Sequence, residues 1–180
     1  MDILVVLEDN HGSLHRMSKE AIAGAQKMGG SISALAIGVN ADAMAGELSG
    51  VDITEVITIN HDLVPSYNAD GYSDVESEVI KSESPKTIVA GHSYQTRDFM
   101  PRVSAKLDIP FIPDIISMDN GIVKQVLNAK LNALVTTSAD QVILSFQSAT
   151  FSEEAMVTGS CLTRSIEVNL DSSIVRSEAE

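Results

Sequence analysis

Short apolar runs alternate with segments of helical periodicity through residues 2–107, and this alternation constrains the fold more than any other feature. The sequence predicts strands at residues 2–8, 31–38, 55–60, 86–90 and 109–118, and helices at 14–28, 41–48, 70–83 and 98–107. Strands that alternate with helices form a parallel sheet that is covered on both faces. We therefore expect an α/β protein, a doubly wound three-layer α/β/α arrangement with a mostly parallel sheet.

The carboxyl-terminal part lacks this alternation. Residues 124–137 and 141–148 are apolar or β-branched without a helical segment between them, so we expect antiparallel strands that extend the sheet. Residues 166–170 alternate in polarity and predict a last strand. With 180 residues in all, the chain fits a single α/β domain at 1–170 and an acidic tail at 171–180.

Composition narrows the classes of function. Twelve basic and 25 acidic residues give a net charge of −13, which repels nucleic-acid backbones and anionic membranes. Cys161 is the only cysteine, so no internal disulfide can form. The first apolar run follows Asp2 without a basic segment, which is typical of a strand and not of a signal peptide. No run reaches membrane-spanning length, and we expect a cytoplasmic protein without membrane insertion.

Two details of the predicted helices can be checked directly. Pro101 is tolerated only in the first turn of a helix, so we expect Asp98 to be the N-cap of the fourth helix. In the helix at 70–83, the acidic residues, Glu76 among them, are expected to face solvent opposite an apolar stripe.

A polar turn follows the strand at 86–90. Ligands of open parallel sheets gather at the carboxyl ends of the strands, so this turn holds our candidate cofactor-binding residues. They are Gly91, His92, Ser93, Tyr94 and Arg97. Arg97 could anchor a phosphate or a partner's carboxylate, although His92 and Ser93 could equally serve only to satisfy backbone groups in the turn. Because neighbouring side chains on a turn point apart, we expect no catalytic Ser–His pair and no catalytic residues.

Other candidate sites are weaker. The chain contains neither of the glycine-rich phosphate-binding motifs, and Glu8 and Asp9 in the first strand-to-helix loop would repel phosphate. His11 and His15 lie beside these carboxylates, but surface histidines are the more frequent explanation, and we expect no metal site. Cys161 has no neighbouring His or Lys and is expected to be inert. Asp114 is expected to pair with a basic side chain.

The segment around this turn resembles a known family. Ala-Gly-His-Ser at residues 90–93, followed by Asp-Phe-Met-Pro-Arg-Val-Ser-Ala at 98–105, resembles the amino-terminal domain of the electron transfer flavoprotein alpha subunit. The resemblance extends back through residues 3–8 and Gly12-x-Leu14 and forward through residues 114–116, so it covers most of the chain. The sequence departs from the family pattern at Leu127-Asn128-Ala129 and at residues 146–151.

The resemblance implies a role in an assembly. In that family, FAD is held by a second, carboxyl-terminal domain, whereas this sequence ends at Glu180. We therefore expect a stand-alone version of the amino-terminal domain, or half of a split subunit, with no cofactor on this chain alone and FAD in the assembly. The expected partner is a beta-type subunit or a separate flavin domain; electron transfer belongs to the assembly, and the chain is not expected to be catalytic alone.

Two alternatives stay open. One is a small adenine-nucleotide-binding α/β domain of the stress-protein and nucleotide-hydrolase superfamily, which would use residues 91–97 for phosphate. The other is a purely structural homo-oligomer.

Overall fold

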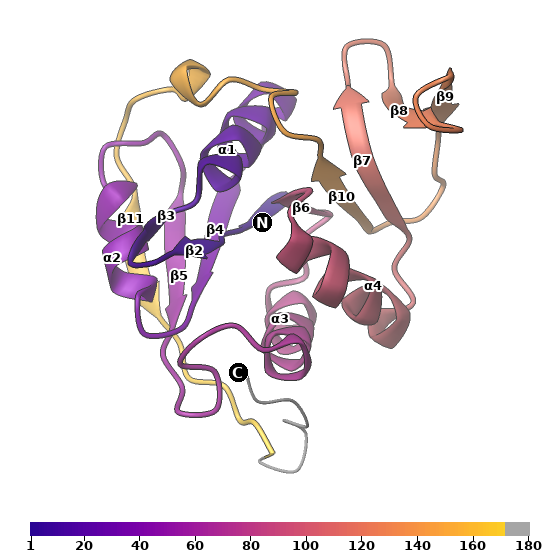
Figure 1. Cartoon of the computed structure of the whole chain (residues 1–180). Coiled ribbons are helices and arrows are strands. Elements are labelled where there is room, and N and C mark those ends of the chain that lie inside the picture. Colours follow the sequence, from indigo (N-terminus) through magenta and orange to yellow (C-terminus); the bar gives the residue numbers. More distant parts are fainter. Residues whose placement is uncertain (172–180) are drawn as a thin grey trace.

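A computed structural model of the chain describes residues 1–171. Its strands are β1 (Ile3–Val6), β2 (Asp9–Asn10), β3 (Ser13–Leu14), β4 (Ile32–Ile37), β5 (Glu55–Ile59), β6 (Thr87–Gly91), β7 (Phe111–Ser117), β8 (Ile122–Val126), β9 (Leu131–Val135), β10 (Val142–Phe146) and β11 (Leu162–Ser165). The helices are α1 (Arg16–Met28), α2 (Ala41–Glu47), α3 (Ala69–Glu83) and α4 (Tyr94–Leu107), with a short 3₁₀ turn η1 (Glu153–Ala155). Figure 1 shows their arrangement.

Nine of these strands form one sheet in the order β11-β5-β4-β1-β6-β10-β7-β8-β9. The first seven run parallel, and β8 and β9 form an antiparallel extension beside β7. One apolar core lies between the sheet and α1 and α2, and a second lies between the opposite face and α3 and α4. The strands at the centre are buried on both faces, which is why β1 is an uninterrupted apolar run and Ser33 is the one polar residue in β4. The α/β/α prediction is confirmed.

The order of the strands reverses at the middle of the sheet. From β1 the chain proceeds to β4 and β5 on one side and then crosses to β6 on the other side. The connections after β1 and β6 therefore diverge, with α1 covering one face and α4 the other. In open α/β sheets this divergence opens a crevice at the carboxyl ends of the strands.

The position of β10 corrects one prediction. We expected residues 141–148 to form an antiparallel strand, but β10 lies between β6 and β7 and is parallel to both. Ile143 and Leu144 are buried on opposite faces, which is typical of a central strand. The last strand was also misplaced, because β11 covers residues 162–165 and the segment 166–170 is not a strand. Of the expected acidic tail, residues 172–180 lie outside the described part of the chain.

The start of α4 is a second correction. Ser93 is the N-cap, with its Oγ accepting the backbone N–H of Thr96 at 3.1 Å, so the helix begins four residues before Asp98. Asp98 instead accepts a hydrogen bond from the hydroxyl of Tyr67 at 2.7 Å. Pro101 therefore lies in the helix interior, where it cannot donate to the carbonyl of the residue four positions earlier.

Glu76 is a third correction, since it lies in the core and not on the solvent face of α3. The residue has no exposed surface, and neither carboxylate oxygen has a hydrogen-bond partner among the described residues. Burial without a partner disfavours the charged form and raises the pKa of Glu76 to about 8. Glu76 is therefore mostly neutral at pH 7.

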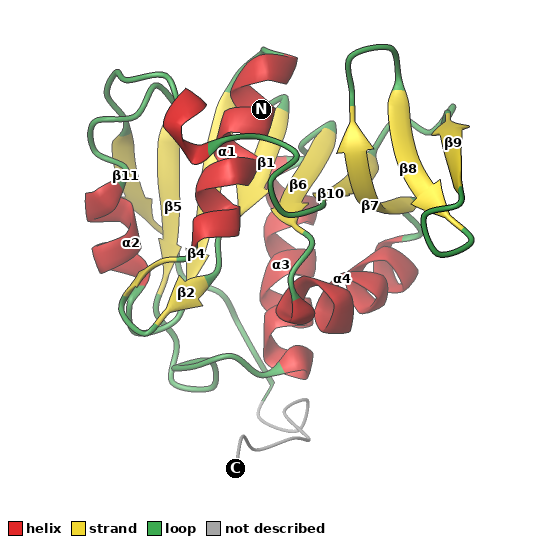
Figure 2. Ribbon diagram, turned by 45° about the horizontal axis from the view of Figure 1, so that its top comes forward, coloured by secondary structure: helices red, strands yellow, loops and turns green. Residues whose placement is uncertain are grey.

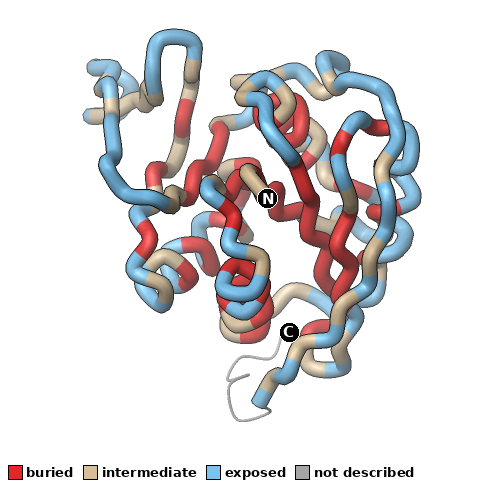
Figure 3. The backbone as a smooth tube through the Cα atoms, turned by 180° about the vertical axis from the view of Figure 1, so that it is seen from behind, coloured by how far each residue is buried: buried red, intermediate tan, exposed pale blue. Residues whose placement is uncertain are grey.

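The hairpin formed by β8 and β9 extends beyond the helical layers (Figure 2). Seen from behind in Figure 3, the central strands are buried, whereas this hairpin is mostly intermediate or exposed. None of the helices within residues 1–171 is both long and apolar enough to cross a membrane.

Candidate functional site

A cleft of about 610 Å³ opens at the carboxyl edge of the sheet, at the point where the strand order reverses. Its walls come from the segments that follow β1, β6 and β10 and from the middle of β7. The lining residues are Glu8, His15, Met17, His92, Ser93, Tyr94, Gln95, Arg97, Asp114, Gln147 and Ser148. Four of the five predicted site residues are among them, and Gly91 ends the strand that leads into the cleft.

Gly91 allows β6 and α1 to approach each other closely. A Cβ atom at this position would lie 2.6 Å from the Cβ and 3.0 Å from the carbonyl oxygen of Met17. Real Cβ atoms do not approach backbone this closely, so a larger residue would push α1 away from the sheet. The glycine therefore allows Met17, which lines the cleft, to lie against the end of β6.

The His92 ring is held by a hydrogen bond with Ser145, a fully buried residue of β10. The two side chains are joined by a 2.8 Å hydrogen bond between His92 Nδ1 and Ser145 Oγ. The opposite ring nitrogen, Nε2, lies 4.0 Å from Asp114 Oδ1. Asp114 was expected to pair with a basic side chain, and its nearest such group is this imidazole.

This Ser–His–Asp grouping is not a catalytic triad. Ser145 is fully buried and cannot reach a substrate carbonyl, and the gap between His92 and Asp114 exceeds a hydrogen bond. The Ser93 hydroxyl is engaged with Thr96 in capping α4 and has no hydrogen bond with the His92 ring. Burial lowers the pKa of His92, with Asp114 opposing the shift, so the imidazole is neutral at pH 7.

Asp114 reaches the cleft because β7 contains a bulge. Opposite the two-residue step from Leu144 to Phe146 on β10, β7 takes three residues from Ile112 to Ile115. Both isoleucines consequently belong to the same core, and Asp114 is turned out of the strand pattern with φ of 61°. A bulge of this kind re-aims a side chain.

Tyr94 and Arg97 form the rim of the cleft. Tyr94 is 88% exposed, and the Arg97 guanidinium lies 5.5 Å from the centre of its ring. Both side chains belong to the first turns of α4, so the helix presents a stacked aromatic and cationic pair to solvent. This pair is of the type that is enriched at protein interfaces.

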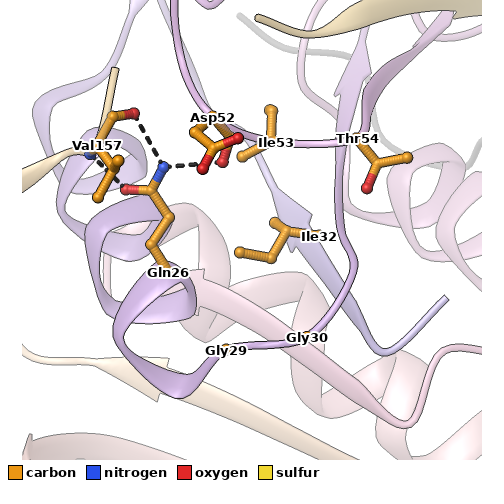
Figure 4. Close-up of a pocket in the computed structure, with 8 residues that line it drawn as sticks. All are labelled: Gln26, Gly29, Gly30, Ile32, Asp52, Ile53, Thr54 and Val157. Carbon is orange, nitrogen blue, oxygen red and sulfur yellow. Dashed lines mark hydrogen bonds between the residues drawn. The ribbon is translucent and has the colours of Figure 1, made fainter. Parts of the chain in front are cut away.

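A second hollow, at the amino ends of β4 and β5, has a different character (Figure 4). The Gln26 amide donates to the carbonyl oxygens of Asp52 and Val157 at 3.0 and 3.2 Å and accepts the N–H of Val157 at 2.8 Å. Because Gln26 and its neighbours satisfy one another, this hollow is a structural clamp that fastens the segment after η1 to α1.

The remaining candidates stay apart from the cleft or have structural partners. His15 accepts the N–H of Met17 as the N-cap of α1, and His11 lies in the β2–β3 turn. Among residues 1–171, no group of three or more His, Cys, Asp or Glu side chains could hold a metal ion. Cys161 donates to the carbonyl of Leu48, and burial raises the pKa of its thiol. Both features oppose reactivity.

Sequence reasoning missed Ser145, Gln147 and Ser148. All three lie on or just after β10, which was expected at the margin of the sheet and not at its centre. The uninterrupted apolar run from Val142 to Leu144 was the available signal, since such runs are typical of strands buried on both faces.

The chain matches the family model of the electron transfer flavoprotein domain over residues 3–169. Electron transfer flavoprotein subunit alpha of Bacillus subtilis is 31% identical over 118 residues, which cover 64% of this chain and 36% of that protein. Acryloyl-CoA reductase electron transfer subunit beta of Anaerotignum propionicum is 29% identical over 122 residues, or 66% of this chain and 33% of that protein. Protein FixB of Clostridium saccharobutylicum is 26% identical over 121 residues, which cover 65% of this chain and 36% of that protein. The chain thus spans about a third of the length of these curated relatives.

Proposed function

Because this chain belongs to the electron transfer flavoprotein domain family, we propose that it is an alpha-type domain that assembles with a beta-type subunit or a separate flavin-carrying domain. In this proposal the flavin belongs to the assembly, and the chain supplies a scaffold without catalytic activity of its own. Two of the similar proteins are named as subunits of electron transfer systems, which supports a role in a complex.

The observation that carries the proposal is the open hairpin of β8 and β9. Leu127 at its tip is 68% exposed, and Leu131 and Leu134 on β9 are 57% and 65% exposed. Side chains of a strand alternate between faces, so Leu131 and Leu134 lie on opposite faces of the hairpin. Exposed apolar residues gathered on an edge strand mark a surface that another chain covers.

Charge indicates what kind of surface fits there. Residues 120–139 contain Lys124 and Lys130 but no acidic residue, in a chain whose net charge is −13. Complementary charge steers association and fixes register. The hairpin therefore suits an apolar partner surface with an acidic rim, and its unpaired β9 edge can accept a further strand by backbone hydrogen bonds.

The rim of the cleft provides a second contact in this proposal. No acidic side chain is paired with Arg97 in the described chain, where its guanidinium stacks on Tyr94. A carboxylate of the partner would form a charge-assisted hydrogen bond with it. The contact region along α4 then consists of Tyr94 and Arg97, with Gly91, His92 and Ser93 holding the turn in place.

The proposal excludes FAD binding by the isolated chain. Glu8 and Asp114 line the cleft, and their charges oppose a pyrophosphate. Equilibrium dialysis of the purified chain against FAD should show no uptake at micromolar ligand. Stoichiometric uptake under the same conditions would contradict the scaffold role and assign the flavin to this chain.

A further inference from the structure

The interior of the carboxyl-edge cleft has hydrogen-bonding groups that the proposed partner contact does not use. The ends of β6 and β10 and the bulge of β7 bring His92, Gln147 and Asp114 into one hollow of about 610 Å³. The volume lies within the usual range for small-molecule sites, and its position at the reversal of strand order is where open α/β sheets bind ligands.

The hydrogen-bond network fixes which nitrogen of His92 carries the proton. Ser145 Oγ accepts the backbone N–H of Asp114 at 3.4 Å and lies 2.8 Å from His92 Nδ1. Ser145 is fully buried, and among the described residues Nδ1 is the acceptor within reach of its hydroxyl hydrogen, so we assign that hydrogen to the bond with Nδ1. Nδ1 is therefore the acceptor, and the neutral ring carries its hydrogen on Nε2. The imidazole presents an N–H donor toward Asp114, across the cleft.

The gap between these two groups has the dimensions of one bridging oxygen. His92 Nε2 and Asp114 Oδ1 are 4.0 Å apart, too far for a direct hydrogen bond. A hydroxyl oxygen about 2.8 Å from each atom spans this gap, accepting from the imidazole N–H and donating to the carboxylate. A carboxylate cannot make the second bond, because it has no hydrogen to donate, and the negative charge of a phosphate is repelled by the Asp114 carboxylate.

The other residues that line the cleft favour a ligand with several hydroxyl groups over a ligand with one. The Gln95 and Gln147 amides and the Ser148 hydroxyl also line the cleft, and each can both donate and accept. The Tyr94 ring stands exposed at the mouth, where it offers an apolar face to the C–H groups of a sugar or polyol. The cleft is lined by two acidic residues, Glu8 and Asp114, and one arginine, Arg97. The net charge of these side chains is negative, which disfavours polyphosphates.

From these contacts we propose that the cleft binds a neutral polyhydroxyl group, either a free polyol or the ribose of a nucleoside, with one hydroxyl bridging His92 and Asp114. The β7 bulge serves this site by turning Asp114 out of the strand and into the cleft. The hydrogen-bonding groups of the site all belong to this chain, so ligand binding can be measured without a partner, although Tyr94 is shared with the partner contact proposed above.

Two-dimensional ¹H–¹⁵N NMR titrations of the full chain with ribitol and with adenosine test the proposal. For ligands of this size we expect dissociation constants of about 1–10 mM and shifts centred on residues 92–97 and 147–148. Shifts with ribitol identify a free polyol as sufficient, whereas shifts with adenosine alone identify the ribose of a nucleoside. Inorganic phosphate, the third titrant, should leave these resonances in place.

Asp114→Asn is the deciding variant, because Asn adopts the left-handed backbone conformation as readily as Asp while removing the ionised acceptor. We expect it to weaken binding about tenfold. Asp108→Asn is the matched control, since Asp108 also has a positive φ (55°) but lies at the end of α4 outside the cleft. The proposal would be overturned if neither ligand shifted these resonances at about 50 mM. It would also be overturned if Asp114→Asn bound the ligand as tightly as wild type, or if phosphate bound more tightly than the polyol and the nucleoside.

Discussion

The two edge strands of the sheet, β11 and β9, differ in the contacts that hold them and in the side chains that they expose. At the β11 edge, Arg164 donates to both Glu55 oxygens at 2.8 and 2.9 Å and to Glu83 at 2.9 Å, which fastens the last strand to β5 and α3. Within residues 1–171 no ion pair of this kind fastens the β9 edge, and Leu131 and Leu134 are more than half exposed. Charges on an edge strand discourage further pairing, whereas an apolar edge invites it.

This difference between the edges indicates where a partner would bind. A domain that functioned alone would gain by protecting both edges, because an open edge promotes aggregation. Here the strand at one edge is fastened to β5 and α3 by a part-buried ion-pair network, and the other edge extends beyond the helices as a hairpin without such ion pairs among the described residues (Figure 2). We therefore assign the β9 edge as the surface that the proposed partner covers.

The largest effect is expected from Leu134→Lys. Replacing an exposed apolar side chain of the β9 edge by a charged one should weaken binding to the proposed partner by about 100-fold or more, the range of an interface hot spot. The side chain is 65% exposed in the isolated chain, so the free energy of unfolding should change by less than about 0.5 kcal/mol. Isothermal titration calorimetry and urea unfolding measure the two quantities.

Leu162→Lys is the matched control, because Leu162 on β11 is 73% exposed and lies on the clamped edge. It should leave partner affinity unchanged. Equal losses for the two variants would show that the β9 edge has no special role.

Arg97→Ala tests whether the interface continues from the hairpin to the rim of the cleft. Loss of a charge-assisted hydrogen bond worth about 1.5–3 kcal/mol should weaken partner binding by roughly 10- to 150-fold. The thermal midpoint should stay nearly constant, because the exposed guanidinium only stacks on Tyr94. A lowered midpoint with unchanged affinity would make the turn architectural and confine the interface to the hairpin.

Arg164→Met should affect stability and not assembly. It removes the clamp on β11 and leaves Glu55 and Glu83 without their cation, which should cost about 1–2 kcal/mol of unfolding free energy after allowance for solvent screening of the part-exposed pair. Urea unfolding gives the stability, and calorimetry should show wild-type partner affinity. Weakened binding in this variant would contradict the division of roles between the edges.

Acid should release the same clamp. The hydrogen bonds from Arg164 hold the pKa of Glu55 below its ordinary value, so the stabilisation is present above pH 4.5 and is lost as the pH falls through the lower folded-state pKa. Between pH 7 and pH 3, wild type should lose about 1 kcal/mol more stability than Arg164→Met. Parallel pH profiles of the two proteins would refute the link between Glu55 and the β11 edge.

Periodicity predicted the alternating elements through α4 well, because the apolar runs of β1, β4, β5 and β6 are buried on both faces. The cap of α4 was misassigned because Ser93 and Asp98 are both good N-caps, and only the tertiary contact with Tyr67 shows that Asp98 is used elsewhere. The turn at residues 91–97 was placed correctly at the carboxyl edge of the sheet.

The contact between Ser145 and Asp114 inside the cleft could not have been predicted from periodicity. Ser145 and Asp114 are 31 residues apart and come together only because β10 inserts beside β7 and the bulge turns Asp114 outward. Neither the order of non-sequential strands nor a one-residue bulge leaves a periodic signal in the sequence.

The most direct test of the central claim is to capture the tagged chain from the cells that produce it and to analyse what is retained. The account predicts a complex that contains FAD and an electron transfer flavoprotein-type second polypeptide, which Leu134→Lys loses and Leu162→Lys keeps. A chain that retains FAD without any second polypeptide, or a complex unaffected by Leu134→Lys, would contradict it.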